Sequence, residues 1–350
     1  MTGSTERRAV PVKAWAGAGI CLALLGAFGT WFLLGHETSP PCNGLAENES
    51  VRKSVGAAVH PGISCAALGE AIVKATAGSQ PGRHTQAQAQ TMKDVVFALG
   101  WVQSQKIEID PALRVPLATA LADYAPDVHE MLAGLDNEYI VNAGDNKSPW
   151  EADGTYHLSV WNSVLTKTLR AVAVDPQAYA LLRMAETHTA AAQLAAVPAD
   201  ATGVDLSLQP TKNARALGVL DGIAETAKGK DAGPARAWDT AVHEGLLDEE
   251  ADRADPSTSG GRLTAAWLQE LKDTPEPARA ERLRSQGLDM ARAWAQTRGM
   301  AEPTRTDLLA EVESSAHHAH REAKLGAVAV TALLVVVGTL ATGSGPHAAL

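Results

Sequence analysis

The hydrophobic pattern divides this chain into two apolar runs and a mixed region between them. Residues 14–34 and 325–342 contain no charged side chain, whereas the 290 residues between the runs alternate apolar and polar positions. Each run is long enough, as a helix, to cross a hydrocarbon core about 30 Å thick. We therefore predict an N-terminal and a C-terminal transmembrane helix, with the lipid bilayer as one partner of the protein.

The region between the runs has the pattern of an all-α helical bundle. Apolar residues recur at three- and four-residue steps, and the strict alternation typical of strands is rare. Asp110-Pro111 and Asp175-Pro176 each place a carboxylate at a helix N-cap and a proline in the first turn. The expected helices are 84–106, 116–133, 155–173, 176–196, 211–228, 234–253, 262–273, 277–298 and 304–324, and the last is expected to continue into the second apolar run.

Breaks in the helical pattern suggest how the chain is organised. Glycine, proline and short polar residues interrupt it at 142–154 and again at 254–261. The second break is expected to be a linker between a helical body and a membrane-proximal stalk. The predicted parts are a basic tail (1–13), a transmembrane helix (14–34), a membrane-proximal segment (35–82), the body (83–253), the linker (254–261), the stalk (262–324), a transmembrane helix (325–342) and a short tail (343–350).

Four tryptophans lie in the middle of expected helices among small residues. Large aromatic side chains that face alanine-lined grooves commonly fill a helical core. We therefore expect all four to be core residues: Trp101, Trp238, Trp267 and Trp294.

Basic residues at the N-terminus indicate the orientation of the first apolar run. Arg7, Arg8 and Lys13 precede it, which favours a cytoplasmic N-terminus and an extracytoplasmic domain. Arg321 and Lys324 before the second run favour the opposite, but the first helix usually dominates topology. A cleaved signal peptide is the alternative; the run is longer than the usual apolar h-region of a signal peptide, and no A-x-A-like cleavage site follows it.

The cysteines support the extracytoplasmic placement. Cys21 lies within the first run, which leaves Cys42 and Cys65 as the only pair in the remaining sequence. We predict a disulfide between them, because it would stabilise a proline-containing segment by about 3 kcal/mol and such bonds form in oxidising compartments. The alternative is a pair of unrelated reduced cysteines.

The charge of the chain limits its partners. The formal net charge is −10, and the tail 1–13 contains three basic residues and one acid, so the rest carries −12. Such a surface repels nucleic acid, and no basic stripe with interleaved aromatics occurs. A protein in the cell envelope is the more suitable partner, in an oligomeric state that the sequence does not indicate.

Sequence motifs for catalysis are missing from the chain. His129-Glu130 and His243-Glu244 begin like a zinc-protease motif, but neither has a second histidine at the required spacing. No nucleophile elbow, phosphate-binding loop, dinucleotide-binding turn or EF-hand loop occurs. We therefore expect neither an enzyme nor a bound cofactor.

One polar cluster is a candidate metal site. Glu313, His317 and His320 have i, i+4, i+7 spacing and would share one face of the helix before the second apolar run. Imidazoles beside a carboxylate bind divalent metals, and their titration near pH 6.5 would also suit a pH-sensitive collar at the membrane. The alternative is an exposed polar helix without a ligand.

Three segments carry a resemblance to a known group of proteins. They are 117–132 (LATALADYAPDVHEML), 160–185, which includes DPQAYALL, and 217–223 (LGVLDGI). Together this stretch, about residues 117–228, resembles actinobacterial helical proteins of unknown function associated with WXG-type polypeptides and type VII secretion. The resemblance implies an α-helical module in a bacterial envelope and brings no catalytic residues; the two terminal apolar runs depart from the usual soluble form.

These observations favour a membrane-anchored extracytoplasmic helical scaffold, or a secretion-associated interaction protein, in the bacterial envelope. One alternative is a toxin-like or pore-forming secreted effector that inserts its C-terminal helix into a target membrane. The other is an envelope hydrolase whose catalytic residues are far apart in the sequence.

Overall fold

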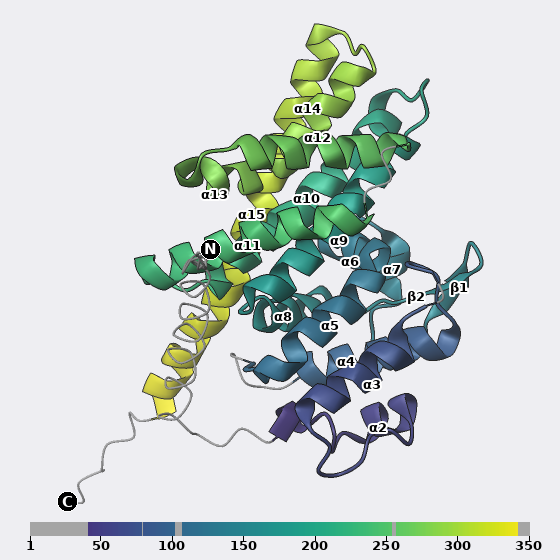
Figure 1. The fold of residues 1–350 in the computed structure, drawn as a ribbon, viewed down its shortest axis with the longest axis vertical. Coiled ribbons are helices and arrows are strands. Elements are labelled where there is room, and N and C mark those ends of the chain that lie inside the picture. Colours follow the sequence, from purple (N-terminus) through teal and green to yellow (C-terminus); the bar gives the residue numbers. More distant parts are fainter. Residues whose placement is uncertain (1–40, 79, 102–106, 254–256, 342–350) are drawn as a thin grey trace, which may run out of the picture. The chain divides into compact units, whose positions relative to one another are not determined.

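The structure is a computed structural model that describes residues 41–78, 80–101, 107–253 and 257–341. The chain from Pro41 onward forms one compact unit, and it is mostly helical, as predicted (Figure 1). It contains a short 3-10 helix, η2 (Pro41–Gly44), and α2 (Glu49–Val55), α3 (Cys65–Thr76), α4 (Gln86–Gly100), α5 (Pro111–Asp123), α6 (Ala125–Ala133), α7 (Asn137–Val141), α8 (Asn162–Val172), α9 (Pro176–Ala196), α10 (Gly203–Ala227), α11 (Ala232–Arg253), α12 (Ser259–Asp273), α13 (Glu276–Arg284), α14 (Gln286–Thr297) and α15 (Glu302–Ala341).

Helix α9 lies at the centre of the bundle. It begins as predicted: Asp175 Oδ1 accepts hydrogen bonds from the backbone N–H of Gln177 (2.9 Å) and Ala178 (3.1 Å), and Pro176 occupies the first turn. It packs against α5, α6, α10, α11, α12 and α14. Because neighbours surround it, several of its polar side chains, such as Arg183 and Glu186, are buried and need partners.

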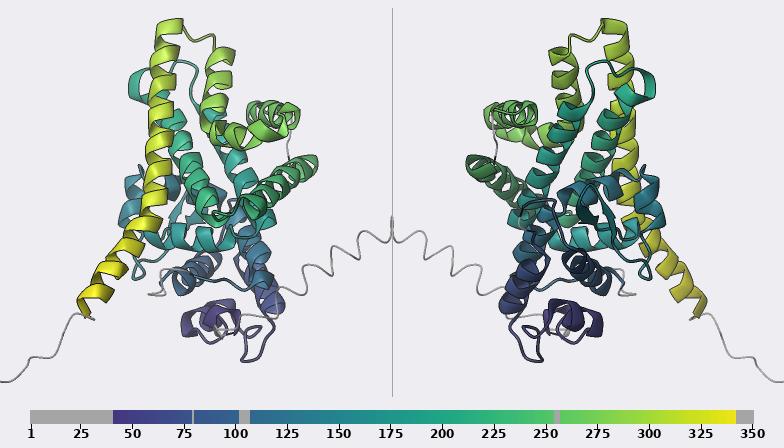
Figure 2. Two further views of the ribbon diagram at one scale, coloured as in Figure 1. Left: turned by 90° about the vertical axis from the view of Figure 1, so that its left-hand side faces the viewer. Right: turned by 90° about the vertical axis from the view of Figure 1, so that its right-hand side faces the viewer.

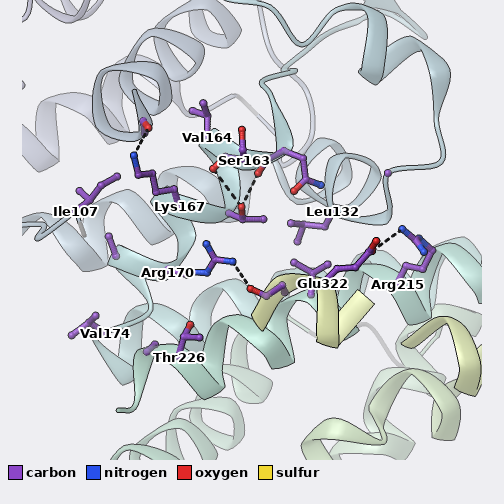
Figure 3. Close-up of a pocket in the computed structure, with 18 residues that line it drawn as sticks. Ile107, Leu132, Ser163, Val164, Lys167, Arg170, Val174, Arg215, Thr226 and Glu322 are labelled. Carbon is purple, nitrogen blue, oxygen red and sulfur yellow. Dashed lines mark hydrogen bonds and ion pairs between the residues drawn. The ribbon is translucent and has the colours of Figure 1, made fainter. Parts of the chain in front are cut away.

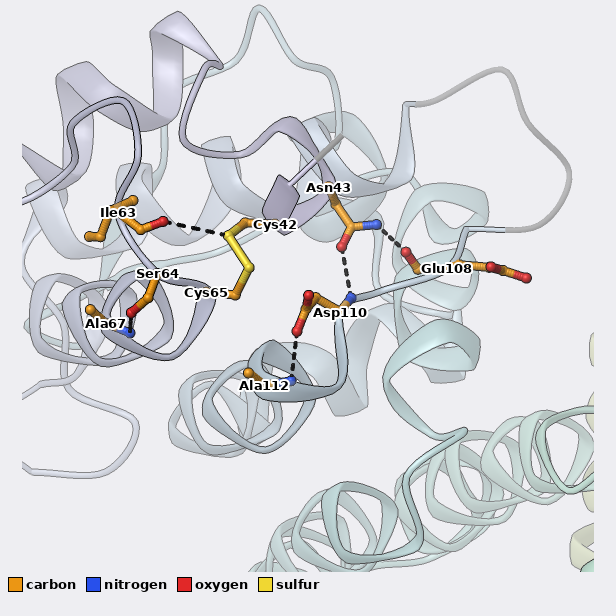
Figure 4. The surroundings of a disulfide bond; sticks show 9 residues. All are labelled: Cys42, Asn43, Ile63, Ser64, Cys65, Ala67, Glu108, Asp110 and Ala112. Carbon is orange, nitrogen blue, oxygen red and sulfur yellow. Dashed lines mark hydrogen bonds between the residues drawn. A yellow bond between two sulfur atoms is a disulfide. The ribbon is translucent and has the colours of Figure 1, made fainter. Parts of the chain in front are cut away.

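The N-terminal part of the described chain is fixed by a disulfide. Cys42 and Cys65 are bonded, with their Cα atoms 5.1 Å apart, which confirms the predicted pair (Figure 4). Next to it, Asn43 accepts a hydrogen bond from the backbone N–H of Asp110 (2.8 Å) and donates one to the carbonyl of Glu108. The bond therefore joins η2 to α3, while Asn43 joins η2 to the start of α5.

A small hairpin replaces the beginning of an expected helix. The helix predicted from residue 155 begins at Asn162, and β1 (Trp150–Ala152) pairs antiparallel with β2 (Thr155–His157) instead. The turn residues Asp153 and Gly154 both have positive φ, 51° and 73°. Asp-Gly is a strong two-residue hairpin signal, and it outweighs the helical spacing that follows it.

Three of the four tryptophans are in the core, as predicted, and one is not. Trp238, Trp267 and Trp294 are buried, but Trp101 is 55% exposed. Trp101 follows the last residue of α4, so the helical periodicity that predicted its burial no longer applies there. It packs on Trp161, which is 39% exposed, with ring centroids 5.0 Å apart.

Helix α15 runs parallel to α10 along much of its length (Figure 2). The contact follows one register, from Thr211–Glu311 through Gly218–Ala316 to Glu225–Lys324. The residues expected to form a separate stalk thus pack against the body, with α12 and α14 also contacting α9. Of the expected linker 254–261, residues 259–261 form the first turn of α12, and 254–256 lie outside the described residues.

The structure describes the backbone of most of the second expected membrane span and nothing of the first. Residues 14–34 lie outside the described part of the chain. The second run continues α15 without a break to Ala341, as predicted, although the side chains beyond Leu325 are not described. Among the described residues, no helix has the length and apolar character that crossing a membrane requires.

Candidate functional site

A cleft between α8, α10 and α15 has three basic side chains among its described lining residues (Figure 3). Its volume is about 680 Å³. Helices α8 and α10 supply most of the described lining, and Glu322 and Ala323 of α15 close one side. The cleft therefore depends on the packing of α15 against α10.

Three basic side chains from two helices face this cleft. Lys167 and Arg170 lie about one turn apart on α8; Lys167 Nζ donates to the carbonyl of Gly100 (3.3 Å), and Arg170 donates to that of Ala323. Arg215, from α10, donates from Nε to the carbonyl of Ala133 (2.7 Å). These bonds hold the three side chains in place along the cleft.

The cleft has one acidic side chain among its described lining residues. It is Glu322, whose Oε2 is 3.7 Å from Arg215 and whose side chain is 55% exposed. Arg170 Nε is buried and has no hydrogen-bond partner among the described residues. Burial lowers the pKa of both Lys167 and Arg170, because it removes solvent from their charged forms.

The remaining wall of the cleft is largely apolar. Aliphatic side chains from α6, α8, α10, the segment before α5 and the turn between α8 and α9 line it: Ile107, Leu132, Val164, Val174 and Val219. A ligand in this space would meet hydrocarbon on one side and guanidinium or ammonium groups on the other.

The candidate metal residues are not gathered into a site. His320 Nε2 lies 2.9 Å from Glu225 Oε2 of α10, while Glu313 and His317 are exposed. Within the described ranges, no group of three or more histidine, cysteine, aspartate or glutamate residues is arranged to hold a metal ion. Lys324, and then His320, lower the pKa of Glu225, which keeps its carboxylate charged on the α10–α15 contact.

The most deeply buried charge in the described core is on α9. Arg183 is fully buried, and its guanidinium donates to Asp221 of α10 (2.7 Å) and to Gln286 of α14 (2.6 Å). It also donates to the backbone carbonyls of Leu217 and Leu283. A buried guanidinium needs this many acceptors because it has lost its water. The network links four helices, α9, α10, α13 and α14.

A second buried group involves one of the two His-Glu pairs considered in the sequence. His129 lies 2.8 Å from Glu186 of α9 through Nδ1, and 2.9 Å from Asn213 of α10 through Nε2. All three side chains are buried, and burial raises the pKa of Glu186. Asn213 also donates from Nδ2 to the carbonyl of Ala190 on α9 (2.8 Å), so this group crosslinks α6, α9 and α10.

A third group supports the hairpin. Asp127 accepts hydrogen bonds from Tyr139 Oη (2.7 Å) and from the backbone N–H of Leu158 (2.8 Å), and it lies 2.7 Å from His157 Nδ1. The contact with Asp127 raises the pKa of His157. Burial raises the pKa of Tyr139, so its hydroxyl stays protonated and remains a donor.

Sequence reasoning missed the cationic cleft. Arg215 of α10 is 45 positions after Arg170 and 48 after Lys167 of α8, so no local motif joins all three. The available signal was the position of Lys167 and Arg170 on a helix that is otherwise mostly apolar on its buried face. Comparison with family models, curated proteins and solved structures finds no match to this chain.

Proposed function

We propose that this chain is a membrane-anchored, extracytoplasmic helical interaction protein of a bacterial envelope, with a secretion-associated partner. The observation that carries the proposal is the fixed attachment of α15. This helix is packed along α10 and then continues, without interruption, into the apolar sequence 325–342. If that sequence enters a membrane, the helical domain is held at a set angle and height above it.

The disulfide supports an extracytoplasmic location. Cys42 and Cys65 are joined, and disulfides persist mainly in oxidising compartments. The basic residues before the first apolar run favour the same side of the membrane for the domain.

An aromatic surface supports a binding role. Phe97, Trp101 and Trp161 form a cluster with ring centroids 5.0 to 6.1 Å apart. Both tryptophans keep a substantial part of their surface exposed, and tryptophan is enriched among the residues that dominate protein interfaces. We propose this cluster as the contact surface for the protein partner.

Topology is tested in intact protoplasts. Protease added outside should digest the helical domain, and the same protein should remain in the membrane fraction. Protection until lysis would contradict the orientation, and release of intact protein into the medium would favour the secreted-effector alternative.

The contact surface is tested by replacing Trp101 and Trp161 with alanine, with Ile140→Ala as the matched exposed control (Ile140 is 59% exposed). Crosslinking in cells followed by affinity purification should recover a partner with wild-type and Ile140→Ala protein, and several-fold less with the double variant. Equal recovery from all three would contradict the surface. Alanine at Glu313, His317 and His320 should leave recovery unchanged, because two of these side chains are exposed and none forms a described metal site.

A further inference from the structure

We propose that His129 and Glu186 hold one buried proton that the unfolded chain does not hold at neutral pH, with the proton on Glu186 and the imidazole uncharged. Formation of the contact between α6, α9 and α10 is then coupled to proton uptake. The pair is thus a pH-sensitive device in the fold, and its contribution to stability falls as the pH rises above neutrality. The inference does not depend on a protein partner or on the membrane placement of the chain.

Asn213 determines which nitrogen of His129 carries a hydrogen. Asn213 Nδ2 donates to the carbonyl of Ala190 (2.8 Å), so its Oδ1 faces His129 Nε2 at 2.9 Å. The opposite orientation of the amide would place its oxygen against the carbonyl oxygen of Ala190, where no hydrogen joins them. An amide oxygen only accepts hydrogen bonds, so Nε2 of His129 must be an N–H donor.

The contact with Glu186 then requires a further proton. His129 Nδ1 lies 2.8 Å from Glu186 Oε2. In a neutral imidazole with its hydrogen on Nε2, Nδ1 carries a lone pair, which would repel an ionised carboxylate at this distance. One proton must therefore lie between Nδ1 and Oε2, and the pair as a whole is uncharged.

Burial assigns this proton to Glu186. His129 and Glu186 are 0% and 1% exposed, and Glu186 Oε1 has no hydrogen-bond partner among the described residues. A buried ionised carboxylate needs donors for both oxygens, whereas the carbonyl oxygen of a carboxylic acid is left without a donor at a smaller cost. Burial raises the pKa of Glu186, which acts in the same direction.

The charged neighbours of the pair are themselves paired. After burial and the contact with the imidazole, Arg183 of α9 lowers the pKa of Glu186 and Glu130 of α6 raises it. Arg183 lies 2.7 Å from Asp221 of α10. Glu130 lies 2.7 Å from Lys212 of α10. Each neighbour has a partner of opposite charge, so the proton is held mainly by burial and by the two hydrogen bonds of the imidazole.

The proton balance gives the sign of the pH dependence. In the unfolded chain, histidine and glutamate have pKa values of about 6.5 and 4.3, so above about pH 6.5 neither side chain holds the extra proton. Folding therefore takes up about one proton there, and the folding equilibrium constant falls about tenfold for each pH unit. Between about pH 4.5 and 6.5 the unfolded imidazole already holds a proton, so the contribution of the pair is complete and nearly constant.

The place of the pair in the fold gives the proton a structural consequence. His129, Glu186 and Asn213 join α6, α9 and α10, and α15 packs along α10. Loss of the proton would leave an unpaired carboxylate in this contact. The pH of the medium is thereby linked to the stability of the helix on which α15 packs.

The test compares the full chain with Glu186→Gln by urea unfolding at pH 7.5 and pH 8.5. The glutamine amide donates to His129 Nδ1 at every pH and takes up no proton from the medium. The ratio of wild-type to variant folding constants should fall by about tenfold between the two pH values. Other titrating groups, such as His157, contribute equally to both proteins and cancel in the ratio. Glu130→Gln is the matched control, because this carboxylate faces the ammonium of Lys212, and its ratio should stay within about twofold.

Two measurements would overturn the proposal. A ratio for Glu186→Gln that is the same at both pH values would show that folding takes up no proton at this pair. Nitrogen NMR of histidine-labelled wild type at pH 7.5 needs no variant and gives the second answer. The ring of His129, assigned through its backbone signals, should be neutral with its hydrogen on Nε2. A hydrogen on Nδ1 alone would contradict the tautomer, and hydrogens on both nitrogens would place the proton on His129 instead of Glu186.

Discussion

Gly218 of α10 lies directly against the main chain of α15 at Ala316. A Cβ atom at position 218 would be 2.5 Å from the carbonyl oxygen of Ala316, closer than real side chains approach. One turn later, a Cβ at Gly222 would be 2.6 Å from the Cβ of Ala323. Two glycines four residues apart therefore let the helix backbones meet, a steric solution also found where helices pack in membranes.

Alanine at position 218 should push α15 away from α10. We expect Gly218→Ala to lower the free energy of unfolding by about 1 to 3 kcal/mol, the usual cost of overpacking. Gly233→Ala in α11 is the matched control, since a Cβ there meets no atom within 4 Å. That control should be neutral or slightly stabilising, because alanine is the better helix former. Urea unfolding followed by circular dichroism measures both, and equal stability would contradict the close contact.

Removing only one charge of the Arg183–Asp221 ion pair should lower the free energy of unfolding. Asp221→Asn leaves a fully buried guanidinium without its charge partner, and we expect a loss of about 3 to 5 kcal/mol. The double variant Arg183→Met with Asp221→Leu removes both charges and should recover much of this loss. Chemical denaturation measures the free energy of unfolding of wild type, Asp221→Asn and the double variant. A double variant as unstable as Asp221→Asn would show that other acceptors of Arg183 matter more.

Loss of the disulfide should destabilise the N-terminal part of the domain. Replacing both Cys42 and Cys65 by serine is expected to lower the free energy of unfolding by about 3 kcal/mol, the value for closing a loop with a sequence separation of 23. Cys21→Ser is the control, because it removes a cysteine that does not take part in this disulfide. Mass spectrometry of unreduced peptides should show the two segments linked, and free thiols in freshly isolated protein would contradict the bond.

The contact between His157 and Asp127 should make stability depend on pH. Because this contact raises the pKa of His157 in the folded state, protonation favours folding. Its contribution is complete below the unfolded-state pKa near 6.5, and it is lost as the pH rises through the folded-state pKa. His157→Gln should therefore cost up to about 1.5 kcal/mol at pH 5.5 and much less at pH 8.5. Urea titrations at both values measure the difference, and a cost independent of pH would contradict the protonated pair.

Local signals predicted the bounds of α9, whereas α10 begins eight residues earlier than expected, and the expected helices 116–133 and 277–298 are each divided in two. Asp175 and Pro176 specify the start of α9 through groups that are adjacent in the sequence, and the structure confirms them. The hairpin differs from the helix expected at 155–173. Asp153-Gly154 is a strong local signal for a hairpin turn, but the apolar residues after it also have helical spacing. Trp101 was assigned to the core by periodicity that ends one residue earlier.

Long-range relationships were beyond sequence reasoning. That Gly218 meets Ala316 depends on two small-residue faces fitting together, and many alanine-rich faces in this chain look equally suitable. The cleft depends on the same packing, since Arg215 and Glu322 approach each other only when α10 and α15 are side by side. The pairing of Arg183 with Asp221 likewise needs the arrangement of α9 and α10 in space.

Helix α10 is synthesised well before α15, the helix that packs along it. The residue that covers Gly218 is made 98 positions after it, which at about 5 to 20 residues per second is a delay of roughly 5 to 20 s. Throughout that interval the face of α10 that carries Gly218 and Gly222 has no native neighbour. A ribosome that stalls within α12–α14 would therefore leave this face open to incorrect association, and chaperones that bind nascent chains should be found there.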